Sequence, residues 1–190
     1  MSAMSEQTAT MRPRSPAAVT PDGAAVILAA ILNADPRPLV QVLQMATGQP
    51  VLRIEVKDKG HGELTMPENA GELDALDAPE GTPARWRTIR QLTETGLVAA
   101  EATFIWVPHR IPAEARALLD QGKRPAGHIL GPLGAERHYR RARALNGAGV
   151  KSQAVLYLDG LPVALAAEEI TYELCEVMAA NWERCLPGCG

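Results

Sequence analysis

The strongest constraint on the fold is a pair of apolar segments within Ser152–Tyr172, separated by Asp159 and Gly160. Asp-Gly suits a type I′ turn, whose central residues both have positive φ, so the pair predicts a hairpin of two antiparallel strands. Arg85–Pro108 also contains two strand-like segments around an internal turn. Pro50–Asp58 alternates apolar and polar residues with a period of two, which indicates a strand with one face in water.

Helical patterns occupy much of the remaining chain. Helices are expected over Ala24–Leu32, Pro38–Ala46, Pro112–Gly122, Pro125–Leu130, Ala135–Leu145 and Glu173–Leu186. Because the strands follow one another instead of alternating with helices, the pattern predicts an α+β fold, with helices packed on an antiparallel sheet of about six strands. Residues Lys59–Ala84 are rich in Gly, Pro and acidic side chains, and we expect a lid or a disordered loop there.

The chain is expected to divide into a disordered tail over residues 1–22, one domain over residues 23–184 and a short tail over residues 185–190. With a net charge of −3 and no apolar run of about 20 residues, neither a nucleic acid nor a membrane is an expected partner. The N-terminus lacks the apolar core of a signal peptide, and an odd number of cysteines fits a reducing compartment, so we expect a cytoplasmic protein.

Sequence motifs for cofactors are absent. There is no glycine-rich nucleotide loop and no HExxH, and the segment Cys185–Cys189 (CLPGC) lacks a second pair of zinc ligands. A zinc site is therefore not expected. The segment Glu136–Arg143 (ERHYRRAR) carries four arginines. They form either a solvated face or a site where one of them, with Arg137 as the candidate, binds an anionic ligand.

Four segments in a fixed order resemble the chorismate pyruvate-lyase-like family, the 4-hydroxybenzoate synthase group. They are Leu32–Val56, with a helix pair, a glycine and a strand; Arg87–Thr103, with an Arg-x-Ile strand and a turn; Arg124–Leu130, with a Pro-x-Gly segment; and Asp159–Ile170, the final hairpin. The resemblance covers roughly Ala24 to Tyr172. It implies a highly curved antiparallel sheet with helical flaps that bury a small aromatic acid.

The same resemblance implies an activity and a site. The family removes pyruvate from chorismate to give a hydroxybenzoate, without metal or cofactor. Carried over by position, Arg87 grips a substrate carboxylate, the backbone amide of Ala126 assists, and Glu168 or Glu169 is the acid/base group. The expected partner is a small aromatic or cyclohexadienyl carboxylate, and the expected assembly is a monomer or a homodimer. A carboxyl in an apolar setting has a raised pKa and suits general acid/base work.

Strand geometry limits which of these side chains act together. Neighbouring residues of a strand face opposite sides, so Glu168 and Glu169 enter one pocket only if a bulge turns one of them. Which of the two acts stays open, and both could instead mark the end of the strand. Arg87 and Arg90 also face opposite sides, and Arg87 is preferred because it matches the Arg-x-Ile pattern through Ile89.

One departure from the family leaves other functions open. Many members carry a second arginine in the strand before Pro108, where this chain has Ala102 or Phe104. Arg110, Arg137 and His109 are the candidates to compensate. The alternatives are another small-molecule enzyme of secondary metabolism, a non-catalytic sensor domain, and an interaction domain. Sensor domains of some transcription regulators share this fold and bind small effectors. Here the 22-residue tail would be too short for a winged helix. An interaction domain predicts that no acidic side chain enters a cavity.

Overall fold

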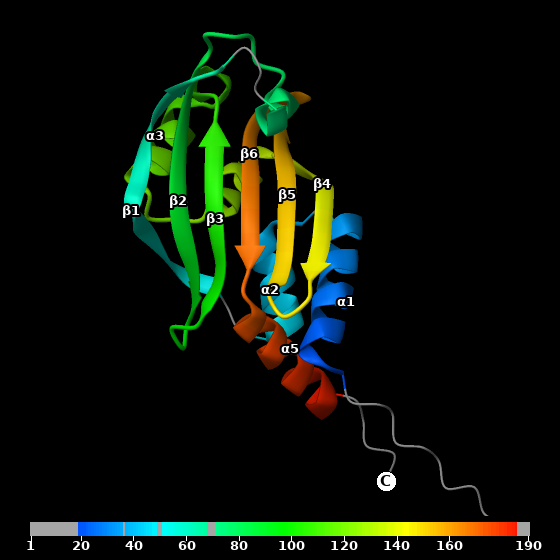
Figure 1. Ribbon diagram of the computed structural model, residues 1–190. Coiled ribbons are helices and arrows are strands. Elements are labelled where there is room, and N and C mark those ends of the chain that lie inside the picture. The colour runs from blue at the N-terminus through cyan, green and yellow to red at the C-terminus, as the bar shows by residue number, and fades with distance from the viewer. Residues whose placement is uncertain (1–18, 36, 49–50, 68–70, 186–190) are drawn as a thin grey trace, which may run out of the picture.

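A computed structural model describes residues 19–35, 37–48, 51–67 and 71–185 of the chain. Six strands form one antiparallel sheet in the order β1-β2-β3-β6-β5-β4 (Figure 1). The strands are β1 Val51–Thr65, β2 Pro83–Thr93, β3 Val98–Trp106, β4 Glu136–Leu145, β5 Gly149–Leu158 and β6 Leu161–Ile170. With helices packed on this sheet, the predicted α+β fold class is confirmed.

Tight turns set the order of the strands. Asp159 and Gly160 have φ of 52° and 77°, as the predicted type I′ turn requires, and they join β5 to β6 with Leu158 opposite Leu161. The predicted pair within residues 85–108 forms β2 and β3. The sheet closes at its centre where β3 pairs with β6, so two hairpins that lie far apart in sequence become neighbours.

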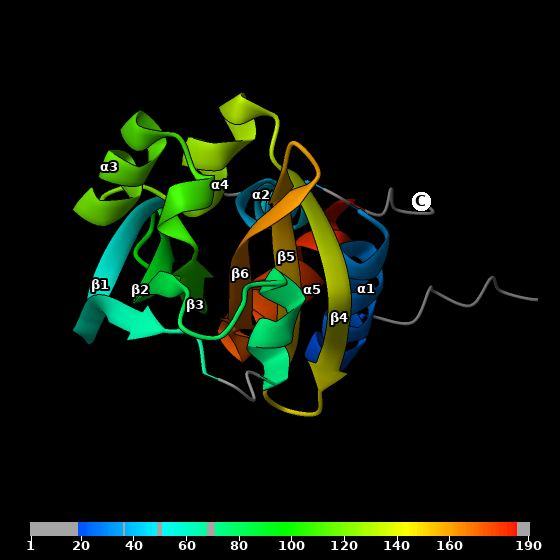
Figure 2. The ribbon, with the colours of Figure 1, turned by 90° about the horizontal axis from the view of Figure 1, so that it is seen from above.

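Most helices lie on one face of the sheet. They are α1 Pro21–Ala34, α2 Leu39–Thr47, α3 Ala113–Gln121, α4 Ala126–Leu130 and α5 Tyr172–Cys185. Figures 1 and 2 show α1, α2 and α5 behind the half of the sheet that contains β4 to β6, and α3 behind β1 and β2. The short 3-10 helices are η1 Gly71–Leu76, η2 Pro108–Arg110 and η3 Gly131–Leu133, and η1 lies on the opposite face.

Two apolar clusters fill the space under the helices. The first joins α1, α2 and α5 to the sheet, with Leu28, Leu43 and Leu174 fully buried. The second lies under α3 and α4 and includes Trp106 and Leu119. Each buried leucine of this kind contributes about 1.5 to 3 kcal/mol. The two clusters flank the space in which the candidate site lies.

The strand β4 corrects the prediction of a basic helix over Ala135–Leu145. Its residues pair with β5 from Glu136, opposite Tyr157, to Leu145, opposite Gly149. A register shift between Tyr139 and Arg141 interrupts the alternation of buried and exposed residues. The period of two was therefore hidden in the sequence, and the run of arginines suggested a helix instead.

The loop predicted over Lys59–Ala84 is also corrected in part. Strand β1 continues past Asp58 to Thr65 and keeps pairing with β2 after a register shift between Val56 and His61. A bulge of this kind lets a glycine-containing segment bend without leaving the sheet. The rest of the predicted loop contains η1, whose buried Leu76 packs on the sheet near Leu165.

The predicted tails fall mostly outside the described residues. Residues 1–18 and 186–190 lie outside them, including Cys189 of the CLPGC segment. Within the predicted first tail, α1 already begins at Pro21, where the Thr20 hydroxyl accepts a hydrogen bond from the Gly23 N–H at 3.1 Å. In the described part of the chain, no helix combines the length and hydropathy that a membrane span needs.

Cys175 offers a test of the packing under α5. Its side chain is fully buried, and burial, with a smaller contribution from Asp22, raises the pKa of the thiol to about 11. Because the thiolate is the reactive form, we expect iodoacetamide at pH 8 to leave Cys175 unmodified in the folded protein and to modify it in urea. Peptide mass spectrometry measures this site separately from Cys185 and Cys189. Equal labelling rates in the folded and unfolded protein would show that α5 does not pack as described.

Candidate functional site

A small pocket lies between the sheet and the helices α2 and α4, with a volume of about 30 Å³. Such a volume holds roughly two water molecules. Its floor is formed by side chains of five strands, namely Arg87, Ile89, Gln91, Ala102, Phe104, Ala166, Glu168, Leu156 and Arg137. Its roof is formed by Pro38, Leu39 and Val40 at the start of α2 and by Pro125, Ala126 and Gly127 at the start of α4.

A buried ion pair occupies one side of this floor. Nη2 of Arg137, on β4, donates to Oε2 of Glu168, on β6, at 2.5 Å. The Ser152 hydroxyl, on the intervening strand β5, donates to the same oxygen at 2.8 Å. The side chains of Arg137 and Glu168 are 9% and 3% exposed, so this buried carboxylate faces a cation and a hydroxyl.

Arg87 occupies the other side of the floor and is 1% exposed. Its Nη1 donates to the Leu119 carbonyl at 3.0 Å and its Nη2 to the Arg124 carbonyl at 2.9 Å. These carbonyls lie at the C-terminal end of α3 and just before α4, where a cation is favourable. Arg87 therefore ties the α3–α4 segment to the sheet. Burial lowers the pKa of Arg87 to about 10, with a partly opposing effect of Asp120.

The buried polar atoms of the floor that have no hydrogen-bond partner among the described residues include the Nε of Arg87 and the Oε1 of Gln91, whose side chain is 5% exposed. Buried donors and acceptors are almost always paired in folded proteins, and leaving one unpaired costs about 1 to 3 kcal/mol. The pocket floor thus offers one N–H and one carbonyl oxygen to a molecule that enters. Its two arginines and one glutamate give it a net charge of +1.

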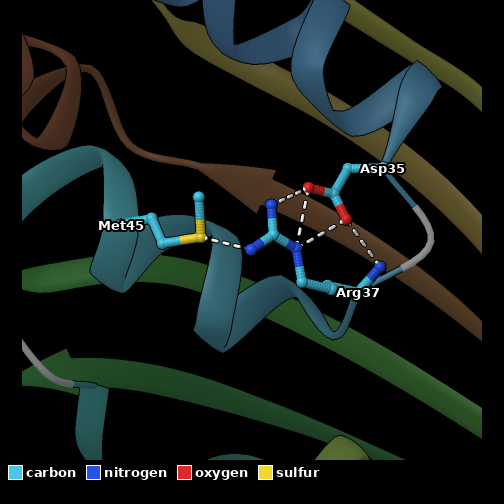
Figure 3. Close-up of polar contacts among 3 residues, drawn as sticks. All are labelled: Asp35, Arg37 and Met45. Carbon is cyan, nitrogen blue, oxygen red and sulfur yellow. Dashed lines mark hydrogen bonds and ion pairs between the residues drawn. The ribbon is translucent and has the colours of Figure 1, made fainter.

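The roof is closely packed and anchored at one end. A Cβ on Gly127 would lie 3.0 Å from the Cβ of Pro38, so α4 packs closely against the start of α2. The turn between α1 and α2 is fastened by Arg37, whose guanidinium pairs with Asp35 and donates to the sulfur of Met45 on α2 (Figure 3). The hydrogen bond from Arg37 lowers the pKa of Asp35.

The structure brings together four of the six predicted site residues. Arg87, Arg137, Ala126 and Glu168 all line the pocket. Arg90 and Glu169 do not: each is exposed on the opposite face, where Arg90 pairs with Glu101 at 2.9 Å and Glu169 with Lys151 at 2.7 Å. Because the strand alternates regularly, Glu168 faces the pocket and Glu169 does not. The catalytic and binding roles assigned to these residues stay predictions.

Sequence reasoning missed Gln91 and Ser152. Gln91 lies on the same side of β2 as Arg87 and Ile89, at the same parity, and Ser152 lies directly opposite Glu168. Both follow from strand parity once the pairing of strands is known. Of the residues considered as replacements for a second arginine, Arg137 lines the pocket, whereas Arg110 donates to the carbonyls of Leu76, Asp77 and Pro162. The described residues contain no group of three or more metal-ligating side chains.

No protein-family model and no curated protein matches this sequence. Solved structures with a similar arrangement include PhnF from Mycobacterium smegmatis, with 14% identity over 70% of this chain and 63% of that one and a TM-score of 0.49. They also include a GntR-family transcriptional regulator from Bacillus cereus, with 12% identity over 63% and 92% and a TM-score of 0.41. A third is the ligand-binding domain of a proposed GntR-family transcriptional regulator from Bordetella bronchiseptica, with 16% identity over 63% and 83% and a TM-score of 0.41.

The predicted lyase activity is corrected. None of these structures is described as a lyase, and two are described as a transcriptional regulator and a regulator's ligand-binding domain, so a chorismate lyase and its hydroxybenzoate product are not supported. In the structure Glu168 is held by Arg137 and Ser152. At these identities the likeness concerns the arrangement of elements alone. What stands of the predicted resemblance is the fold, an antiparallel sheet with helices packed over one face.

Proposed function

We propose that this chain is a sensor-type domain that binds a small anionic molecule between the sheet and the α2–α4 roof, without catalysis. The observation that carries the proposal is the pair of unpartnered polar atoms, Arg87 Nε and Gln91 Oε1, in a pocket floor of net charge +1. An anionic group satisfies both the free N–H and the excess charge. A hydroxyl or amide N–H beside it satisfies the Gln91 oxygen.

Ligand entry requires the roof to move. A volume of about 30 Å³ is far below the roughly 300 Å³ of ordinary small-molecule sites. The roof is made of two short helix starts that touch at Gly127 and Pro38, so their separation opens the pocket without breaking a strand pair. A ligand that binds only the open form shifts the population toward it, as a sensor requires. The proposal therefore includes an open state in which α2 and α4 are further apart.

Thermal unfolding with a set of small carboxylates and phosphates tests this function. A ligand present at about 100 times its Kd stabilises the fold by about 2.7 kcal/mol, which raises the Tm of a domain of this size by roughly 5 to 10 °C. Arg137→Gln should weaken the binding of such a ligand by about tenfold to a hundredfold, because a charge-assisted hydrogen bond is lost. Arg90→Gln, an arginine on the exposed face, is the matched control and should change nothing.

Two results would overturn the proposal. One is equal loss of binding in the Arg137→Gln and Arg90→Gln variants, which would place the ligand elsewhere. The other is chemical conversion of the bound molecule, seen as new signals in the proton NMR spectrum of the ligand after hours with the protein. Recovery of the ligand unchanged, with binding lost only in Arg137→Gln, is the expected result.

A further inference from the structure

The face of the sheet opposite the pocket is only partly covered. In Figure 1 this face is toward the viewer, and η1 crosses it at one end of β5 and β6, while no described helix lies over the other end. That uncovered end is hollowed to a volume of about 460 Å³ between side chains of β2, β3, β6, β5 and β4. Short side chains such as Thr88, Thr103 and Ala167 form its floor, which is why it is concave.

Three cations line one side of this hollow. They are Arg141 and Arg143 of β4 and Lys151 of β5, and Arg143 lies directly opposite Lys151 in the strand pairing. Like charges at directly opposed positions destabilise a sheet. Lys151 is balanced by Glu169 at 2.7 Å. Arg141 and Arg143 make no ion pair or hydrogen bond with any described residue. The carboxylates that also line the hollow are each paired with another cation: Glu101 with Arg90, Glu168 with Arg137 and Glu169 with Lys151.

The floor of the hollow adds neutral donors. Gln153 lies directly opposite Arg141, and its Nε2 is buried without a hydrogen-bond partner among the described residues. The hydroxyls of Thr88 and Thr103 lie 3.2 Å apart. Only one of them donates to the other, which leaves the second hydroxyl proton for another acceptor. Cations at the rim and unpaired donors in the floor thus face the same space.

We propose that this hollow is a second binding site, for the phosphate group of a small phosphomonoester. A phosphate has three terminal oxygens and a charge of about −1.5 to −2 at neutral pH, and it accepts more hydrogen bonds than a carboxylate. Arg141 and Arg143 supply the charge, and the Gln153 amide and the free threonine hydroxyl bind the remaining oxygens. The volume fits a phosphate with an attached body about the size of a sugar or an aromatic ring. The hollow opens on the other face of the sheet from the central pocket, and the two share only Ala102 and Glu168 in their linings.

Titration of the intact chain with glycerol 3-phosphate, phenyl phosphate and inorganic phosphate, followed by NMR of the arginine Nε–H and glutamine side-chain signals, tests this site. We expect the Gln153 side-chain amide to shift and to saturate with the phosphate esters. The double variant Arg141→Gln/Arg143→Gln should bind them at least tenfold more weakly, because two charge-assisted contacts are lost. Arg90→Gln, on the same face but paired with Glu101, should bind them as the unmodified protein does.

Several outcomes would overturn the inference. Unchanged affinity in the double variant, or no shift of the Gln153 amide at saturating phosphate ester, would show that this face binds no phosphate group. Inorganic phosphate binding as tightly as both esters would identify a site for the free ion in place of an ester. Tighter binding of a DNA oligonucleotide through the same arginines would make the face a nucleic-acid surface. The substitutions at Arg90, Arg141 and Arg143 all replace exposed side chains, so the fold is expected to remain intact.

Discussion

Replacing Gly149 by alanine is expected to destabilise the folded protein by about 3 to 4 kcal/mol. Gly149 begins β5 with φ of 88°, a conformation that costs a residue with a Cβ energy. An added Cβ would also lie 2.1 Å from the carbonyl oxygen of Ile170, where β6 ends. Because the atoms that this Cβ would meet belong to the backbone of Ile170, Thr171 and Tyr172, the end of β6 and the start of α5 must shift. Urea unfolding followed by circular dichroism measures the loss.

A second glycine in the same turn separates the two causes. Gly147 also has positive φ, at 65°, but a Cβ on it would meet no atom within 4 Å. Gly147→Ala should therefore lower the free energy of unfolding only by the cost of the positive φ, about 1 kcal/mol. If the two variants lose equal stability, the close approach of Gly149 to Ile170 contributes nothing, and the contact between β5 and the end of β6 is looser than described.

The fold was largely predictable because most of its strands have signals in their local sequence. The Asp159-Gly160 turn and the period of two in β1 are signals carried by neighbouring residues. Strand β4 was missed because a bulge broke its alternation, and only the pairing with β5 reveals which of its residues face inward. A bulge depends on the partner strand, which lies outside the window that a sequence pattern covers.

For the site, the sequence predicted only which side chains of a strand share a face. Parity showed that Glu168 and Glu169 face opposite sides, but which side carries the helices is decided by tertiary packing. Arg137 was chosen as a candidate because it belongs to a segment with four arginines. In the structure Arg137 lines the pocket, while Arg141 and Arg143 lie on the opposite face of the sheet. The function predicted from the resemblance was wrong. The resemblance supplied a nearby glutamate but not its surroundings, which for Glu168 are an arginine and a serine.

Glu168→Gln should have two effects of opposite sign. The variant loses the negative charge that faces Arg137 in a buried site, and removing one partner of a buried ion pair costs about 3 to 5 kcal/mol. Glutamine keeps an oxygen that accepts from the Ser152 hydroxyl, so we expect the free energy of unfolding, measured in urea, to fall by about 3 kcal/mol. At the same time, the anionic ligand of the proposed function no longer competes with a carboxylate for Arg137. Its affinity should rise by about tenfold or more, measured by calorimetric titration.

The neighbouring substitution Glu169→Gln is the matched control for both effects. Glu169 is exposed and pairs with Lys151 on the other face, and such surface pairs contribute at most about 1 kcal/mol. Its stability and its ligand affinity should therefore stay close to those of the unmodified protein. The opposite signs at Glu168 make the result decisive for the sensor function. If Glu168→Gln weakens ligand binding instead, then Glu168 itself contacts the ligand. The bound molecule would then carry a cation or a hydrogen-bond donor at that point, and the net positive charge of the floor would not explain its binding.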